Sequence, residues 1–160
     1  MEKQNKKKIF KLILSIVLTL LIGFIGSLIT NKSLDTWYNT IKKPSFNPPN
    51  WLFAPVWTIL FIMIGLSFYF VWERGFGNKV KTLLFVFLLQ LVLNLLWSYS
   101  FFGLTNPLLA FIVIIILWIA ILINIIIFYK VSKIAGFLLI PYILWVSFAS
   151  ILNLAIVILN

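Results

Sequence analysis

The sequence contains no cysteine and no histidine. These absences exclude disulfides, thiolate metal sites, histidine-ligated haem and a histidine general base. Acidic residues are almost as scarce, because the chain has only Glu2, Asp35 and Glu73, and each lies in a predicted tail, loop or helix end. Proton relays and voltage sensors usually need ionisable groups inside the membrane. We therefore expect no metal and no cofactor, and the sequence disfavours an ion-coupled pump.

Long polar stretches are also missing, since hydrophobic residues make up 63% of the chain and charged residues 10%. Such a composition is typical of integral membrane proteins, and the apolar runs are too long for barrel strands of about 9–11 residues. We predict an all-α membrane protein, a bundle of five transmembrane helices in a single domain over residues 1–160, with a structured first loop. The predicted helices cover residues 9–29, 49–72, 83–102, 107–129 and 134–158.

Basic residues are unevenly divided between the two sides of this bundle. Ten of the 13 Lys and Arg residues fall on the side of the N-terminus and three on the other side. The positive-inside rule then places the N-terminus in the cytoplasm and the C-terminus outside, in a cytoplasmic membrane of the bacterial type. Orientation and contact with anionic lipid headgroups account for the net charge of +10, so we expect membrane lipid and no nucleic acid as a partner.

A stretch rich in proline and tryptophan, residues 37–57, interrupts the apolar sequence. It holds four of the six prolines and three of the seven tryptophans. Lipid cannot hydrogen-bond an irregular backbone, so this stretch must lie outside the bilayer or over an internal cavity. Asn47 is a favoured N-cap, and a proline in the first helical turn loses no helical hydrogen bond. We predict a lid over 37–47, followed by a rigid helix start that directs Trp57 inward.

Aromatic, polar and small residues share single faces of four predicted helices, at spacings of three and four residues. Because successive helices run in opposite directions, most of these faces reach similar depths in the outer half, beneath the first loop. The sequence therefore predicts a pocket with aromatic walls and a few neutral polar groups. Its candidates are Gly23, Gly26, Ser27, Phe53, Trp57, Phe61, Gln90, Asn94, Trp97, Ser98, Phe101, Tyr142, Trp145, Ala149 and Asn153.

Helix packing is the alternative interpretation of the same residues. Asn94 and Asn153 would then form hydrogen bonds between helices, and Gly23 and Gly26 would allow close helix contacts. The indoles near predicted span ends would lie at the headgroup level. These indoles are Trp37, Trp51 and Trp72.

Three motifs carry a family resemblance. They are WYNTIKKPSFNPPNWLFAPVW at 37–57, LNLLWSYSFFG at 93–103 and PYILWVSFASILN at 141–153. In this order and spacing they resemble the TspO/MBR family of tryptophan-rich sensory and translocator proteins, also known as peripheral benzodiazepine receptors. The similarity extends over essentially the whole chain.

The resemblance implies a five-helix bundle, often a homodimer, with a ligand cavity closed by the first loop. It also implies binding of tetrapyrroles such as protoporphyrin IX, and in some members of sterols and of isoquinoline or benzodiazepine-type ligands. The family pocket matches Tyr38, Pro48, Trp57, Phe61, Asn94, Trp97, Ser98, Trp145 and Ala149. To these we add three candidates from the helical faces: Gly26, Phe53 and Tyr142.

We predict a ligand-binding membrane protein of the sensor, scavenger or translocator type that holds a porphyrin under the first loop. Trp57 and Trp145 would offer ring faces and indole donors, and Asn94 a neutral polar contact. Lys42 and Lys43 would attract the propionates or remain ordinary solvated charges. Without histidine, a metal-free porphyrin fits better than haem.

Two other functions remain open. The resemblance implies a light- and oxygen-dependent porphyrin-degrading photo-oxidase that uses Trp57 and Trp145, or a transporter of tetrapyrroles or other hydrophobic small molecules. Cholesterol is disfavoured, because residues 154–160 contain no tyrosine or basic residue where sterol-binding members carry their motif. The predicted third helix lacks small residues spaced for close pairing, so the sequence does not assign a dimer interface.

Overall fold

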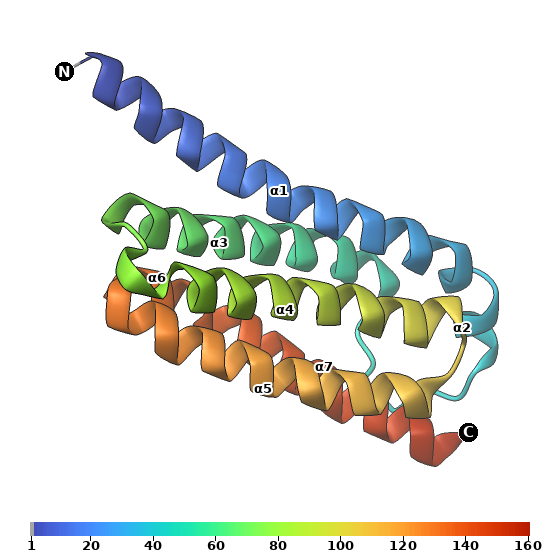
Figure 1. Ribbon diagram of the computed structural model, residues 1–160. Helices are drawn as coiled ribbons and strands as arrows, with labels where there is room; N and C mark the ends of the chain where they lie inside the picture. Colours follow the sequence, from blue (N-terminus) through green and yellow to red (C-terminus); the bar gives the residue numbers. More distant parts are fainter. Residues whose placement is uncertain (1) are drawn as a thin grey trace.

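The computed structural model describes residues 2–160, and the regular secondary structure of this part is helical only (Figure 1). The first residue of the domain predicted over 1–160 lies outside this part. Five of the described helical segments are long and apolar enough to cross a membrane, which confirms the predicted class. These segments are Lys3–Leu34, Asn50–Arg74, Gly77–Gly103, Pro107–Val131 and Lys133–Leu159.

Residues 2–160 contain seven α-helices and three short helical turns, two of them 3-10 turns (η1, η2) and one a π-helical turn (η3), and only α2 lies outside the five segments. In chain order the elements are α1 (Glu2–Leu34), α2 (Trp37–Thr40), η1 (Asn50–Leu52), α3 (Phe53–Arg74), η2 (Gly77–Lys79), α4 (Val80–Ser98), η3 (Tyr99–Gly103), α5 (Pro107–Val131), α6 (Lys133–Leu138) and α7 (Ile140–Leu159).

Three spans differ from their predicted bounds, and the third begins at Gly77 instead of residue 83. The first helix runs well beyond the predicted 9–29 at both ends, because its polar ends contain no proline or glycine to stop it. The last span is divided between α6 and α7 at Leu139, two residues before Pro141. Proline lacks the amide donor that a continuous helix would need there.

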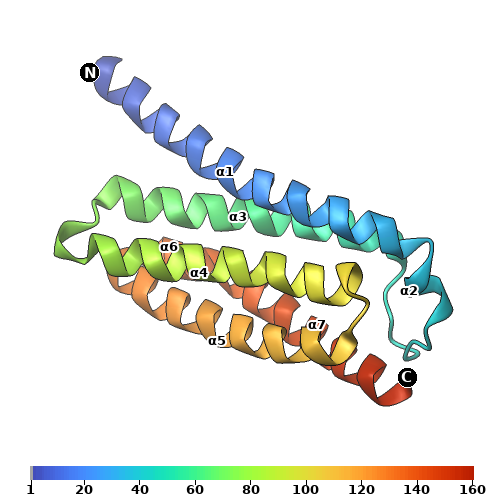
Figure 2. The same cartoon turned by 45° about the vertical axis from the view of Figure 1, so that its right-hand side comes forward.

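Helix α1 packs closely on α3 along part of its length only. At the contact, a Cβ atom on Gly65 would lie 2.7 Å from the hydroxyl of Thr19 and 2.9 Å from the carbonyl oxygen of Ser15. The Thr19 hydroxyl also donates to the carbonyl of Phe61 at 2.7 Å. Towards the N-terminus α1 stands apart from the bundle, while its other half lies along α3 (Figure 2).

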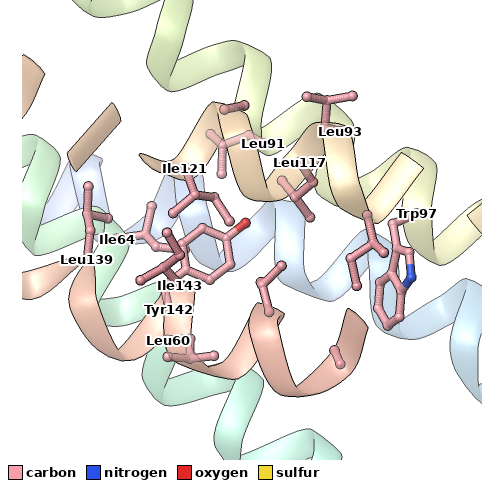
Figure 3. Packing of buried hydrophobic residues seen from close by; sticks show 14 of the residues in the cluster. Leu60, Ile64, Leu91, Leu93, Trp97, Leu117, Ile121, Leu139, Tyr142 and Ile143 are labelled. Carbon is pink, nitrogen blue, oxygen red and sulfur yellow. The ribbon is translucent and has the colours of Figure 1, made fainter. Parts of the chain in front are cut away.

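The middle of the bundle is a continuous apolar core. Tyr142 of α7 lies among Ile64, Ile121 and Ile143, which belong to α3, α5 and α7 (Figure 3). The same core continues towards the first loop as a cluster of aromatic rings, and this cluster forms one side of the site described below.

The first loop is ordered by its own contacts and by α7. Tyr38 is 1% exposed, and its hydroxyl donates to Oδ1 of Asn47 at 2.7 Å. The side-chain amide of Asn160 forms two hydrogen bonds with the backbone of Lys42, each of 3.0 Å. The loop therefore lies against the end of α7, close to the C-terminal residue, as both ribbon views show.

Candidate ligand-binding site

A cavity of about 450 Å³ lies between α1, α3 and α4, in the half of the bundle next to the first loop. Every residue that lines it is uncharged, and several neutral hydrogen-bonding groups interrupt a mainly apolar wall. Its size and lining fit the usual pattern of small-molecule sites. The lining residues are Leu20, Gly23, Phe24, Gly26, Ser27, Thr30, Asn31, Leu34, Asn50, Phe53, Ala54, Trp57, Thr58, Phe61, Asn94, Trp97, Ser98 and Phe102.

The polar groups of the cavity lie mostly where α1 meets α4. The hydroxyls of Thr30 and Ser98 are 3.0 Å apart, and both donate to the carbonyl of Gly26, at 3.0 and 3.3 Å. Deeper in the bundle, Asn94 donates to the hydroxyl of Tyr142 at 3.0 Å. These groups can hydrogen-bond an uncharged polar atom of a ligand. None of them can act as a general acid or general base near neutral pH.

A second, much smaller space of about 20 Å³ lies beside the cavity, towards α7 and the first loop. Tyr38, Trp145 and Ala149 line it and do not line the cavity. Four aromatic residues border both spaces: Phe53, Trp57, Trp97 and Phe102. We call these four residues the aromatic partition.

Trp57 lies at the centre of the aromatic cluster. Its ring centroid is 6.1 Å from that of Trp97, 5.8 Å from that of Phe61 and 6.3 Å from that of Tyr142. Such separations lie within the range in which aromatic pairs attract one another. Trp57 therefore lines the cavity, and its ring packs edge-to-face against that of Tyr142.

The π-helical turn η3 explains why both Phe101 and Phe102 reach this cluster. The amide of Leu104 donates to the carbonyl of Tyr99 at 2.8 Å, a bond across five residues. In a regular helix Phe101 would share the face of Trp97, and Phe102 would turn away from it. Here both rings contact Trp97, with centroids 5.9 and 6.3 Å away.

Burial raises the pKa of Tyr38 to about 12, and the hydrogen bond to Asn47 opposes this shift. The ammonium group of Lys43 lies 4.6 Å from the centre of the Tyr38 ring and donates to the Tyr38 carbonyl. Lys43 is therefore engaged within the loop. Neither Lys42 nor Lys43 lines either space.

Of the candidates taken from the helical faces alone, Gly23 and Ser27 line the cavity, Phe101 and Asn153 line the smaller space, and Gln90 lines neither. The remaining twelve residues predicted for the site fall into three groups. Seven line the cavity: Gly26, Phe53, Trp57, Phe61, Asn94, Trp97 and Ser98. Tyr38, Trp145 and Ala149 line the smaller space. Pro48 and Tyr142 line neither, although Pro48 accepts a hydrogen bond from Asn47 and Tyr142 contacts Trp57.

Sequence reasoning missed several lining residues on α1 and α3. Thr30 and Asn31 follow Gly26 and Ser27 by one helical turn, on the same face. They lie beyond residue 29, where the sequence predicts the end of the first helix, so the predicted helical face does not include them. Extending the helical period by one turn would have included them.

The TspO/MBR family profile matches residues 15–159, nearly the whole chain. The chain belongs to this family. It is 51% identical over 154 residues to tryptophan-rich protein TspO of Archaeoglobus fulgidus, covering 95% of this chain and 98% of the relative. It is 50% identical over 155 residues to the protein of the same name in Chlorobaculum tepidum, covering 96% and 98%. The human translocator protein is 34% identical over 132 residues, covering 81% and 78%.

Membership in the TspO/MBR family confirms the resemblance of the three motifs. Together with the five apolar helices, it identifies the chain as a multi-pass integral membrane protein. The cavity lies against two of the three motifs, 37–57 and 93–103, and the smaller space adds residues of the third, 141–153.

Proposed function

We propose that the protein binds a flat, hydrophobic tetrapyrrole such as protoporphyrin IX in the cavity next to the first loop. The uncharged cavity with its aromatic wall carries this proposal, and membership in the TspO/MBR family supports it. Trp57, Trp97 and Phe61 offer ring surface for stacking, while Asn94 and Ser98 offer neutral hydrogen bonds.

The charged groups of such a ligand constrain how it lies. No cation lines the cavity, and an unpaired carboxylate is costly to bury. We therefore expect the macrocycle to enter the cavity and the propionates to extend outward past Asn31, which is exposed at its border. Lys43 already contacts Tyr38, so it is not the primary partner of the propionates.

Titration of the purified protein with protoporphyrin IX, followed by quenching of tryptophan fluorescence, tests the proposal. Truncation of a central aromatic contact typically costs about 2 kcal/mol or more, so Trp57→Ala should weaken binding more than about tenfold. Trp118→Ala is the matched control, since Trp118 donates to Ser147 on the far side of the bundle and lines neither space. Absence of saturable binding, or equal affinity in wild type and Trp57→Ala, would overturn the assignment.

A light-driven oxidation of bound porphyrin by dioxygen is a second candidate function. Trp57 and Trp145 both line the smaller space, so two oxidisable indoles lie near one another beside the cavity. Under light and oxygen the porphyrin absorption bands should then fade faster with the protein than without it. The protein-dependent rate should disappear in Trp57→Phe and Trp145→Phe while binding persists; identical rates in all samples would exclude this activity.

We also propose that the N-terminus lies in the cytoplasm. Lys8 and Lys11 of α1 pair with Glu73 at the end of α3, at 3.0 and 3.8 Å. The lysine-rich start of α1 and the end of α3 therefore lie on the same side of the bundle. A single cysteine at Lys42 should react with an impermeant maleimide added outside intact cells, and one at Lys79 should not. The reverse pattern would contradict the positive-inside assignment.

A further inference from the structure

The aromatic partition divides the predicted binding residues into two sets. On one side, in the cavity, lie Asn94 and Ser98; on the other side, in the smaller space, lie Trp145 and Ala149. The smaller space, about 20 Å³, has room for no more than a water molecule. A ligand confined to the cavity would therefore not reach the second set.

Three members of the partition are held firmly by their surroundings. Trp97 donates its indole N–H to Asn153 at 3.2 Å. Phe102 packs against Tyr38 and Trp97, with centroids 5.7 and 6.3 Å away, and its carbonyl accepts a hydrogen bond from Ser33. Trp57 contacts three rings, as described above. Movement of any of these side chains would break several contacts at once.

Phe53 is held more weakly than the other three. Like Trp57 it is half-buried, and like that of Phe102 its side chain has no hydrogen-bonding atom, but it begins α3 directly after the 3-10 turn. Its recorded ring contacts are edge-on, to Tyr38 at 6.5 Å and to Trp145 at 6.4 Å. A rotation of the Phe53 side chain would therefore break the fewest contacts and would remove the ring between the cavity and Trp145.

We propose that Phe53 determines the ligand specificity of this site. With its ring in place, a small aromatic ligand binds in the cavity alone. When the ring rotates, the cavity and the smaller space join, and a large planar ligand reaches Trp145 and Ala149. A ligand that favours such a minor conformation makes it the dominant one. This inference rests on the proposed function only in the identity of the large ligand.

The absence of cysteine allows a ligand-free test of the partition. In Ala149→Cys protein, N-ethylmaleimide should react slowly, and adding Phe53→Ala should raise the rate severalfold. Phe53→Leu, which keeps most of the apolar volume, should give an intermediate rate. Phe24→Ala, which truncates a cavity residue outside the partition, should leave the rate unchanged.

A second cysteine position separates opening of the partition from general loosening of the bundle. Ser27→Cys lines the cavity itself, so its labelling rate should be the same with and without Phe53→Ala. An Ala149→Cys rate that Phe53→Ala does not change would overturn the proposal. So would an equal rise at both cysteines.

The specificity is tested with two aromatic ligands of different size, protoporphyrin IX and naphthalene. Phe53→Ala should shift the affinity ratio towards the porphyrin by about tenfold, the scale on which changes in apolar pocket size discriminate ligands. Phe53→Trp should shift the ratio the other way. If both ligands bind and Phe53→Ala leaves their affinity ratio unchanged, Phe53 does not determine the specificity. Wild-type protein that binds neither would reject the proposed function, whereas the labelling rates would still decide whether the partition opens.

Discussion

The indole N–H of Trp97 donates to Oδ1 of Asn153 across 3.2 Å, and both side chains are buried. The amide group of Asn153 also donates to the carbonyl of Pro107 at 2.8 Å. One side chain of α7 therefore joins α4 to the start of α5, and it fixes the ring plane of a tryptophan that lines the cavity. Asn153 therefore forms hydrogen bonds between helices, as the packing interpretation expects, and it also lines the smaller space beside the cavity.

Replacement of Asn153 by leucine should destabilise the bundle. The change removes two hydrogen bonds and leaves the Trp97 donor unpaired, which costs about 1–2 kcal/mol by typical values for buried and membrane hydrogen bonds. Equilibrium unfolding in mixed micelles measures the loss. Protoporphyrin IX affinity should fall as well, because Trp97 is no longer held; wild-type stability in this variant would contradict the role assigned to the amide.

Replacement of Asn124 by leucine, in contrast, should not destabilise the bundle. Asn124 is 1% exposed and Gln90 0%, and neither carboxamide has a hydrogen-bond partner among the described residues. Phe87 lies one turn before Gln90 on α4, and Phe128 lies one turn after Asn124 on α5. Their rings stack with centroids 5.9 Å apart. Because α4 and α5 are antiparallel, the two carboxamides lie at the same level. Unpaired buried amides are costly. Asn124→Leu should therefore leave the unfolding free energy unchanged or raise it, and a loss as large as that of Asn153→Leu would show that Asn124 has a partner.

Gly65→Ala should weaken the contact between α1 and α3. The added methyl group would meet the Cα atom of Ile16 at 2.8 Å and the carbonyl oxygen of Ser15 at 2.9 Å, and neither backbone atom can move alone. Overpacking of this kind costs about 1–3 kcal/mol. The nearest atom to a Cβ on Gly26 would be 3.7 Å away, so Gly26→Ala is a matched control that should unfold as wild type does.

The first loop should loosen at high pH. Burial raises the pKa of Tyr38 from its ordinary value of 10.0 to about 12. The folded protein thus favours the neutral phenol, and this stabilisation is complete below pH 10 and is lost as the pH rises towards 12. Maleimide labelling of Ala149→Cys, corrected for the reagent's own pH dependence, should accelerate over this interval. Tyr38→Phe should remove that acceleration, and its persistence would assign the transition to another group.

The sequence was sufficient for the helical class, the family motifs and half of the cavity residues. Periodicity places Trp57 and Phe61 on one face, and the alternating direction of the helices brings Asn94 to a similar depth. Periodicity does not fix side-chain rotamers, however. It could not reveal that the Phe53 ring contacts Trp145 edge-on, or that Lys43 folds onto Tyr38. Both depend on contacts between segments that only the folded chain brings together.

The π-helical turn at Tyr99–Gly103 makes the length of this segment as important as its composition. Removal of a single residue there would restore regular helical hydrogen bonding, but would rotate the chain beyond it by about 100°. Phe102 would leave the partition even though every neighbouring side chain was kept. A deletion scan should therefore be more harmful here than substitution of any one of the five residues, and relatives that differ in length at this point should have pockets of different shape.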